Sequence, residues 1–235
     1  MQINRFIRMW LFAIAISLLS TACSGPQSLR LRSEVDSLAA PEARGKTHFV
    51  ILPGNKEVNE QDLQFLEFKS YVEKVLATRG FSKASSLENG DVVLFLSYGV
   101  GPPETQQYSY DVPVWMDSGY YYPYYRRSRF YSGVSAYTQR IESYTTYKRY
   151  LVLEAYDMAQ YRQEKLVQIW KTSVNSSGTS ADLRLVFPYM AAAMQPYIGS
   201  NTGHMVSIDI DEQNPLLREL LWPVVQSSPV AVPAK

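Results

Sequence analysis

The sequence predicts an α+β fold: a two-layer domain in which two main helices pack on a mixed, mostly antiparallel sheet of about seven strands. Two segments carry apolar residues at helical spacing. Several short segments alternate apolar with polar residues or are apolar throughout, and turn-forming Gly, Pro and Asn residues separate them. We therefore expect one domain over residues 29–222, followed by a flexible tail at 223–235 that is rich in Pro, Val and Ser.

The first residues are typical of an export signal. Two arginines precede an apolar run from Met9 to Leu19, and small residues then lead to Cys23, the only cysteine. A basic start, an apolar core of about ten residues and a small-residue exit predict a secretory signal peptide and not a membrane span. We expect residues 1–22 to be removed and residues 23–28 to form a short tether. An ordinary signal peptide that happens to contain a cysteine is the alternative.

The residues before Cys23 resemble the lipobox of bacterial lipoproteins, with Ser20 standing where that family usually has leucine. In that family the cysteine sulfur is acylated and the chain is cut before it, so the resemblance implies a lipid anchor at Cys23. The next residue is Ser24 and not aspartate, which by the same resemblance favours delivery to the outer membrane. A lone thiol in an exported chain has no partner for an internal disulfide, which agrees with lipid attachment.

The composition does not fit a protein with a strong net charge. Removal of residues 1–22 and their two arginines leaves 213 residues with 21 basic and 22 acidic side chains. This balance does not indicate a nucleic-acid-binding protein, and an exported location argues against that partner as well. No second apolar run approaches the roughly 18 residues that a transmembrane helix needs. The expected membrane attachment is therefore the N-terminal lipid.

The first strands of the domain follow from local patterns. In residues 29–35 apolar side chains alternate with charged ones, which predicts a half-exposed strand at a sheet edge. Residues 48–52 form a compact apolar strand that ends at a Pro-Gly-Asn turn. Residues 91–98 are apolar on successive positions, which indicates a central strand covered on both faces.

Residues 59–80 predict the clearest helix. Asn59 is a suitable N-cap, and Gly80 is a suitable left-handed C-cap with Phe81 beyond it, as in a Schellman ending. The helical spacing defines one apolar stripe that faces the core, made of Phe65, Phe68, Val72, Val75 and Leu76.

The second half predicts four further strands and a second main helix. The strands are expected at 139–148, 150–156, 166–174 and 205–210, the helix at 181–197, and one short helix between residues 214 and 221. Pro188 falls within the main helix, where its ring removes a backbone hydrogen bond. It must therefore kink that helix or mark its first turn.

An ordered set of packing motifs carries a family resemblance. The motifs are KTHFVILPGN at 46–55, RGF at 79–81, DVVLFLSYGVG at 91–101, YLVLEAYD at 150–157, KLVQIW at 165–170 and DLRLVFPYM at 182–190. Together they resemble a family of bacterial lipoproteins known only as a domain of unknown function, although the connection at 157–165 is longer than that family's short turn. The resemblance implies an envelope location and a small α+β domain, and it implies no reaction.

The sequence offers no catalytic constellation. The two histidines, His48 and His204, each stand near the start of an expected strand, where ordinary strand-end residues are a better interpretation than a shared metal site. The single thiol is assigned to the anchor, and no nucleophile motif or phosphate-binding loop is present. We therefore expect a protein that is not an enzyme and that holds no metal and no cofactor.

A tyrosine-rich insert at 104–137 is the unusual feature. Residues 106–137 hold nine of the eighteen tyrosines and show no clear periodicity, so a low-complexity loop is one interpretation. The other is an interaction surface, because Tyr, Trp and Arg dominate binding hot spots. The candidate binding residues are Trp115, Tyr120, Tyr121, Tyr122, Tyr124, Tyr125, Arg126, Arg127 and Arg129.

Three functions remain open on these observations. The first is a non-enzymatic, outer-membrane-anchored module facing the periplasm that binds an envelope protein or an envelope glycan. The second is an accessory subunit of an envelope transport or secretion system. The third, an envelope hydrolase, lacks the residues that the chemistry needs.

Overall fold

The described part of the chain, residues 29–117 and 132–221 of a computed structural model, contains a seven-stranded mixed sheet and four α-helices. This confirms the predicted α+β class. The signal peptide and tether expected at 1–28 and the tail expected at 223–235 lie outside the described residues. No helix among the residues described is long and apolar enough to cross a membrane.

The sheet has the strand order β3-β2-β4-β5-β6-β1-β7. The strands are β1 (Arg30–Ala39), β2 (His48–Pro53), β3 (Ser82–Lys83), β4 (Val92–Asp117), β5 (Ser132–Asp157), β6 (Gln168–Gly178) and β7 (Val206–Asp211). Strand β2 runs parallel to β3 and β4, while the β4–β5, β5–β6 and β6–β1 pairs are antiparallel.

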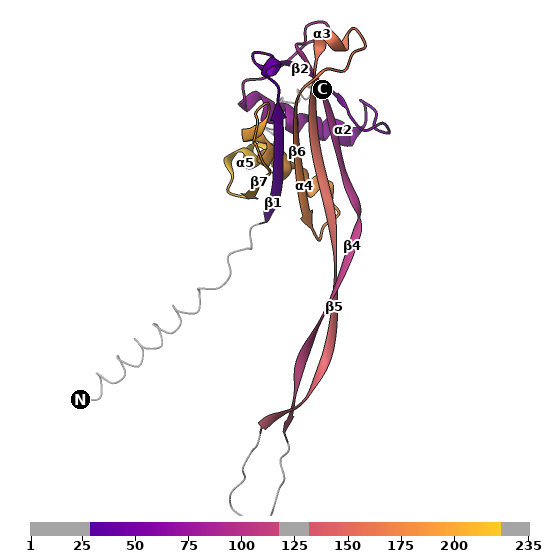
Figure 1. The fold of residues 1–235 in the computed structure, drawn as a ribbon, viewed down its shortest axis with the longest axis vertical. Coiled ribbons are helices and arrows are strands. Elements are labelled where there is room, and N and C mark those ends of the chain that lie inside the picture. The colour runs from indigo at the N-terminus through magenta and orange to yellow at the C-terminus, as the bar shows by residue number, and fades with distance from the viewer. Residues whose placement is uncertain (1–28, 118–131, 222–235) are drawn as a thin grey trace, which may run out of the picture. The chain divides into compact units, whose positions relative to one another are not determined.

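Helices cover one face of this sheet (Figure 1). They are α2 (Leu63–Thr78), α4 (Leu183–Met194) and α5 (Pro215–Leu221), whereas the short α3 (Met158–Tyr161) and the 3₁₀ turns η1 (Pro41–Ala43) and η2 (Gln195–Tyr197) lie in connections. The core forms between these helices and the apolar side chains that the strands direct toward them, so alternate residues of β1, β5 and β6 are buried.

Helix α2 has the predicted apolar stripe but a different N-cap. All five predicted stripe residues are buried. The helix begins after Asp62, whose carboxylate accepts a hydrogen bond from the Phe65 amide at 3.0 Å, and not after Asn59. At the other end Gly80 has φ of +81°, and the Phe81 amide donates to the Leu76 carbonyl at 3.1 Å. This is the predicted Schellman ending.

Helix α4 is buried on nearly every side. Asp182 caps it by accepting hydrogen bonds from two backbone amides of the first turn. Pro188 lies past that first turn, inside the helix, which excludes the first-turn position, one of the two predicted alternatives. Three consecutive alanines, Ala191–Ala193, are buried where α4 meets its neighbours, because small side chains allow close approach.

Several strand predictions are confirmed and others are corrected. Strand β4 is central as predicted, and Val92, Val93 and Leu94 are all fully buried. From Phe95 to Tyr98 buried and half-buried residues alternate, so coverage on both faces holds only for the first residues of the strand. Strand β1 is half-exposed as predicted, but it is not an edge strand because β7 lies beyond it. The strands expected at 139–148 and 150–156 are one continuous strand, β5.

The tyrosine-rich insert also differs from the irregular segment that the sequence suggested. Strand β4 continues through it to Asp117, and β5 begins within it at Ser132. Figure 1 shows both strands running on together past the ends of their neighbours in the sheet. The described residues of this insert, which look aperiodic in the sequence, therefore form the two strands of a long hairpin.

Candidate functional site

The extended parts of β4 and β5 form a structure that we call the β-ribbon, residues 104–117 and 132–146. Antiparallel pairing is continuous along it, from Glu104 opposite Thr146 to Asp117 opposite Ser132, with one register shift next to Trp115. Strand β2 pairs with β4 only as far as Leu96, and β6 pairs with β5 only from Tyr147 onward. Among the described residues the ribbon strands therefore have only each other as neighbours.

One face of the β-ribbon carries a tyrosine cluster. Tyr108 and Tyr110 both donate hydrogen bonds of 2.6 Å to the carboxylate of Glu142 on the opposite strand. The Tyr108 ring lies 5.9 Å from the Tyr110 ring and 6.2 Å from the Tyr144 ring, measured between centroids. The shared carboxylate and the ring contacts hold the aromatic side chains in a fixed arrangement at the surface.

The tyrosine cluster changes the acidity of its members. The hydrogen bond to Glu142 and the negative charge of its carboxylate raise the pKa of Tyr108. The same hydrogen bond is the main cause of the raised pKa of Tyr110. In turn, the two phenol donors lower the pKa of Glu142. The cluster is therefore held together over the pH range in which Glu142 is ionised and both phenols are protonated.

Several large apolar or aromatic side chains of the β-ribbon are exposed. The exposed fractions are 69% for Tyr137, 67% for Ile141 and 65% for Trp115. No helix or third strand covers them in the described structure. Exposed apolar surface of this kind is typical of a contact surface.

The structure describes only one of the predicted binding residues. Trp115 lies in β4 near the described end of the β-ribbon. The other predicted residues, Tyr120, Tyr121, Tyr122, Tyr124, Tyr125, Arg126, Arg127 and Arg129, lie outside the described residues, as does Cys23. The tyrosine cluster was missed, although polar residues that alternate with Tyr108, Tyr110 and Val112 give the period of two that indicates a strand.

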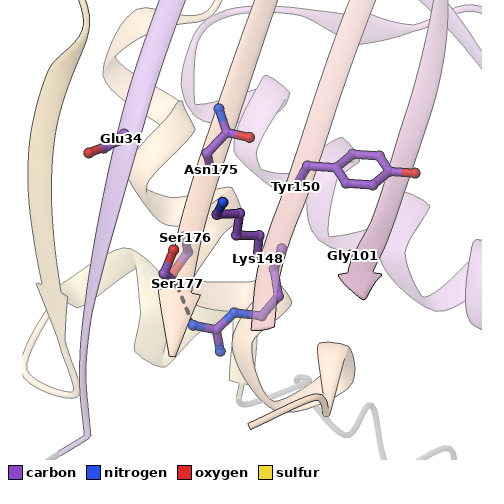
Figure 2. A pocket seen from close by; sticks show the side chains of 8 residues that line it. Glu34, Gly101, Lys148, Tyr150, Asn175, Ser176 and Ser177 are labelled. Atoms are coloured by element: carbon purple, nitrogen blue, oxygen red, sulfur yellow. Dashed lines mark hydrogen bonds between the residues drawn. The ribbon is translucent and has the colours of Figure 1, made fainter. Parts of the chain in front are cut away.

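A second surface lies on the sheet face opposite the helices, near the base of the β-ribbon. A groove of about 330 Å³ is lined there by residues of β1, β4, β5 and β6 (Figure 2). We call it the open-face groove. Its central row follows from strand register: Tyr150 of β5 lies opposite Asn175 of β6, and Asn175 lies opposite Glu34 of β1. Lys148 and Ser177 form the next row.

Gly99 decides where the Tyr150 ring lies. A Cβ at Gly99 would stand 2.6 Å from the Tyr150 hydroxyl oxygen and 2.8 Å from two ring carbons, so a larger residue there would displace the ring from its place over β4. Figure 2 shows Tyr150 extending toward β4, on the far side from Asn175. The groove between β5 and β6 stays open as a result.

On the helix-covered face, Arg149 is a buried cation without a carboxylate partner among the described residues. Its side chain is 3% exposed. One guanidinium nitrogen donates to Ser176 Oγ at 3.2 Å and another to the Ser180 carbonyl at 3.4 Å, while Nε has no hydrogen-bond partner within the described chain. Burial lowers the pKa of Arg149. Burial of this charge therefore costs folding free energy, and no ion pair offsets that cost.

His48 has a partner that the sequence did not suggest. Its Nδ1 lies 2.8 Å from a carboxylate oxygen of Asp91, and this contact is the main cause of the lowered pKa of Asp91. Ser82 is the register partner of His48 in β3, but the described residues show no hydrogen bond between the two side chains. No group of three or more His, Cys, Asp or Glu residues suited to a metal occurs among the residues described.

The comparisons with known proteins concern the family and the fold. A family described as a domain of unknown function, DUF4136, matches residues 36–195, more than half of the chain. No curated protein sequence matches. A PDZ domain protein from Parabacteroides distasonis ATCC 8503 is a structural neighbour, with a TM-score of 0.41 and 8% identity over 78% of this chain and 39% of that one. This chain thus spans well under half of that protein. On the extent of the family match, the chain belongs to the DUF4136 family of domains of unknown function.

Proposed function

We propose that the protein is a lipoprotein of the bacterial envelope, anchored in the outer membrane by acyl groups on Cys23 and facing the periplasm, where it acts as a non-enzymatic binding module. The signal-like residues before Cys23 support the location. Several acyl chains would hold the protein far more firmly than the single chain that gives only marginal membrane binding.

The observation that carries the binding role is the β-ribbon. A hairpin of two strands is marginally stable by itself in water, yet this one continues far beyond the sheet with both outer edges unpaired in the described structure. Natural proteins usually shorten or cover such edges, because unpaired backbone groups recruit other chains. A long ribbon that instead exposes aromatic side chains fits a surface that a partner covers.

The composition of the β-ribbon supports a partner of mixed polar and apolar character. Tyrosine and tryptophan bury much area and still offer a polar atom, which explains their enrichment at interfaces. The tyrosine cluster is already ordered by Glu142, so less side-chain entropy is lost when a partner binds. The partner is an envelope protein or an envelope glycan.

Crosslinking in living cells tests this proposal. A photo-crosslinking amino acid is placed at Tyr137 or Ile141 of the β-ribbon, and at Leu63 of α2, which is 83% exposed, as the matched control. We expect the ribbon positions, and not Leu63, to give one discrete adduct. A defined protein in the adduct favours an accessory subunit of an envelope transport or secretion system, whereas a polymer favours a glycan-binding module. Equal yields at all three positions would contradict a binding role for the β-ribbon.

A further inference from the structure

The geometry points to a second binding site, the open-face groove, that recognises a neutral, hydroxyl-rich ligand of the saccharide class. This site lies on the sheet and not on the β-ribbon, so it would bind its ligand whether or not the ribbon has a partner. Three neighbouring strands supply its central row, Tyr150, Asn175 and Glu34. Strand spacing of 4.7–4.9 Å makes this row roughly 10 Å long between the outer Cα atoms.

The polar groups of this row are available to a ligand. Within the described chain, no hydrogen bond or ion pair engages the carboxylate of Glu34, the carboxamide of Asn175 or the hydroxyl of Tyr150, and Ser177 beside them is equally free. Glu34, Asn175 and Ser177 are exposed at the groove. A carboxylate accepts hydrogen bonds, a carboxamide both donates and accepts, and hydroxyls do either. Neighbouring hydroxyl groups of a sugar match such a set.

The aromatic ring of Tyr150 adds a flat apolar surface beside these polar groups. One side of the ring rests on Gly99, so that side is covered and the ring is held in place. The residue retains an exposed fraction of 36%, which leaves part of the ring open to the groove. Because the ring extends toward β4, it forms an apolar platform at one end of the polar row (Figure 2). This arrangement suits a ligand that is apolar on one face and polar at its rim, as a pyranose ring is.

Charge argues for a neutral ligand. Lys148 pairs with Glu104 at 2.7 Å, and Arg32 at the next groove along pairs with Asp209 at 3.0 Å, so both of these exposed cations already have a carboxylate partner. The third cation, Arg149, also lines the groove, but it is only 3% exposed and its guanidinium donates to Ser176 Oγ and the Ser180 carbonyl. Glu34 is then the exposed charged group of the groove that has no ion pair among the described residues, and its carboxylate repels phosphates and other anions. An anionic ligand is therefore disfavoured, and a ligand that donates hydroxyl hydrogen bonds is favoured.

The position of the row argues against a peptide in strand form. Strands β5, β6 and β1 each have neighbours on both sides at this point in the sheet, so none offers a free edge for strand addition. A ligand must instead lie flat across the side chains. This arrangement suits a short oligosaccharide.

Saturation-transfer NMR and calorimetry test the site with neutral trisaccharides as probes: cellotriose, maltotriose and triacetylchitotriose. The full-length protein is purified in a detergent without a sugar headgroup, because a glycoside detergent would compete. We expect at least one trisaccharide to bind, with saturation transferred to its ring protons. Substitution Tyr150→Ala or Asn175→Ala should weaken binding by about fivefold to tenfold, the loss that one good contact produces.

Two further variants make the test decisive. Glu34→Gln changes an exposed side chain, so it should weaken saccharide binding and leave the melting temperature unchanged. This variant keeps the test valid if Tyr150→Ala fails to fold. Leu38→Ser, on an exposed part of the same strand outside the groove, should bind as the parent does. The inference is overturned if no trisaccharide binds, if Glu34→Gln and Asn175→Ala bind as tightly as the parent, or if trilysine binds in the groove and the saccharides do not.

Discussion

Phe68 of α2 stacks face to face on Phe187 of α4, with ring centroids 3.9 Å apart and ring planes only 6° from parallel. Both side chains are fully buried. Tyr98 of β4 meets the two rings edge-on, at 4.8 Å from Phe68 and 6.0 Å from Phe187. These three rings join the two main helices to each other and to the sheet, and they lie at the centre of the core.

Substitution Phe68→Asp should therefore unfold the domain. A buried carboxylate without a partner costs several kcal/mol, out of the ~5–15 kcal/mol available to a domain. Circular dichroism and thermal melting measure the outcome. The control is Leu63→Asp in the first turn of the same helix, where the side chain is exposed and an acidic residue is favourable, so its melting temperature should match the parent. A Phe68→Asp protein that melts within a few degrees of the parent would show that the helix packing is wrong.

Lipid attachment at Cys23 is a separate prediction of the proposed function. Intact-mass measurement of protein extracted from membranes should give a chain that begins at residue 23 and carries acyl groups. Substitution Cys23→Ala should give a protein that is not acylated and that is soluble or retained as the precursor. An unmodified thiol at Cys23 in the mature membrane protein would rule out the anchor.

The tyrosine cluster should be visible in a pH titration of the β-ribbon. Because Tyr108 and Tyr110 donate to Glu142, their raised pKa values place ionisation above the ordinary value of 10.0. The stabilisation is present below that ordinary pKa and is lost as pH rises through the raised values. Near-ultraviolet absorbance should show Glu142→Gln shifting phenol ionisation to lower pH. The control Ser143→Ala, on the opposite ribbon face, should leave the titration unchanged, and an unchanged Glu142→Gln curve would refute the contact.

Arg149 should be dispensable for stability when its volume is kept. Substitution Arg149→Met removes a desolvated charge that has no carboxylate partner in the described structure, and Ser176 Oγ keeps its hydrogen bond to the Arg32 carbonyl. We expect stability to rise by about 1 kcal/mol, or roughly 2–4 °C in melting temperature for a domain of this size. Arg149→Ala leaves a void and should lower the melting temperature. If Arg149→Met is as destabilising as Arg149→Ala, the guanidinium stabilises the fold through its hydrogen bonds.

The sequence predicted the helices well because burial imposes a period on them. The stripe of α2 from Phe65 to Leu76 recurs at helical spacing, and one face of that helix must meet the sheet. The position of a strand within the sheet was harder to predict. The charged residues of β1 suggested an edge strand, yet they lie on the open face of the sheet, and β7 is the next strand beyond β1. Strand β7 lies more than 150 residues further along the chain, and a local sequence pattern cannot indicate so distant a neighbour.

The β-ribbon and the open-face groove were harder to predict for a related reason. Neither face of the ribbon is buried, so the alternation around Tyr108 and Tyr110 is polar against aromatic and lacks the apolar period of a core strand. The groove depends on register between β1, β5 and β6, which brings Glu34, Tyr150 and Asn175 into one row. Register of distant strands is set by the folded sheet and cannot be read from any one segment.

The central claim is that the β-ribbon is a binding surface and not part of the core, and shortening the ribbon tests it most directly. Pro103 and Tyr147 are register partners at its base, so an Asn-Gly turn can join the two strands just beyond them and replace residues 104–146. Partner recovery is then measured for the parent and the shortened chain by co-purification after mild chemical crosslinking. We predict that the shortened chain keeps the melting curve of the parent and recovers no partner. A shortened chain that unfolds, or that folds and still recovers the partner at the level of the parent, would contradict the account.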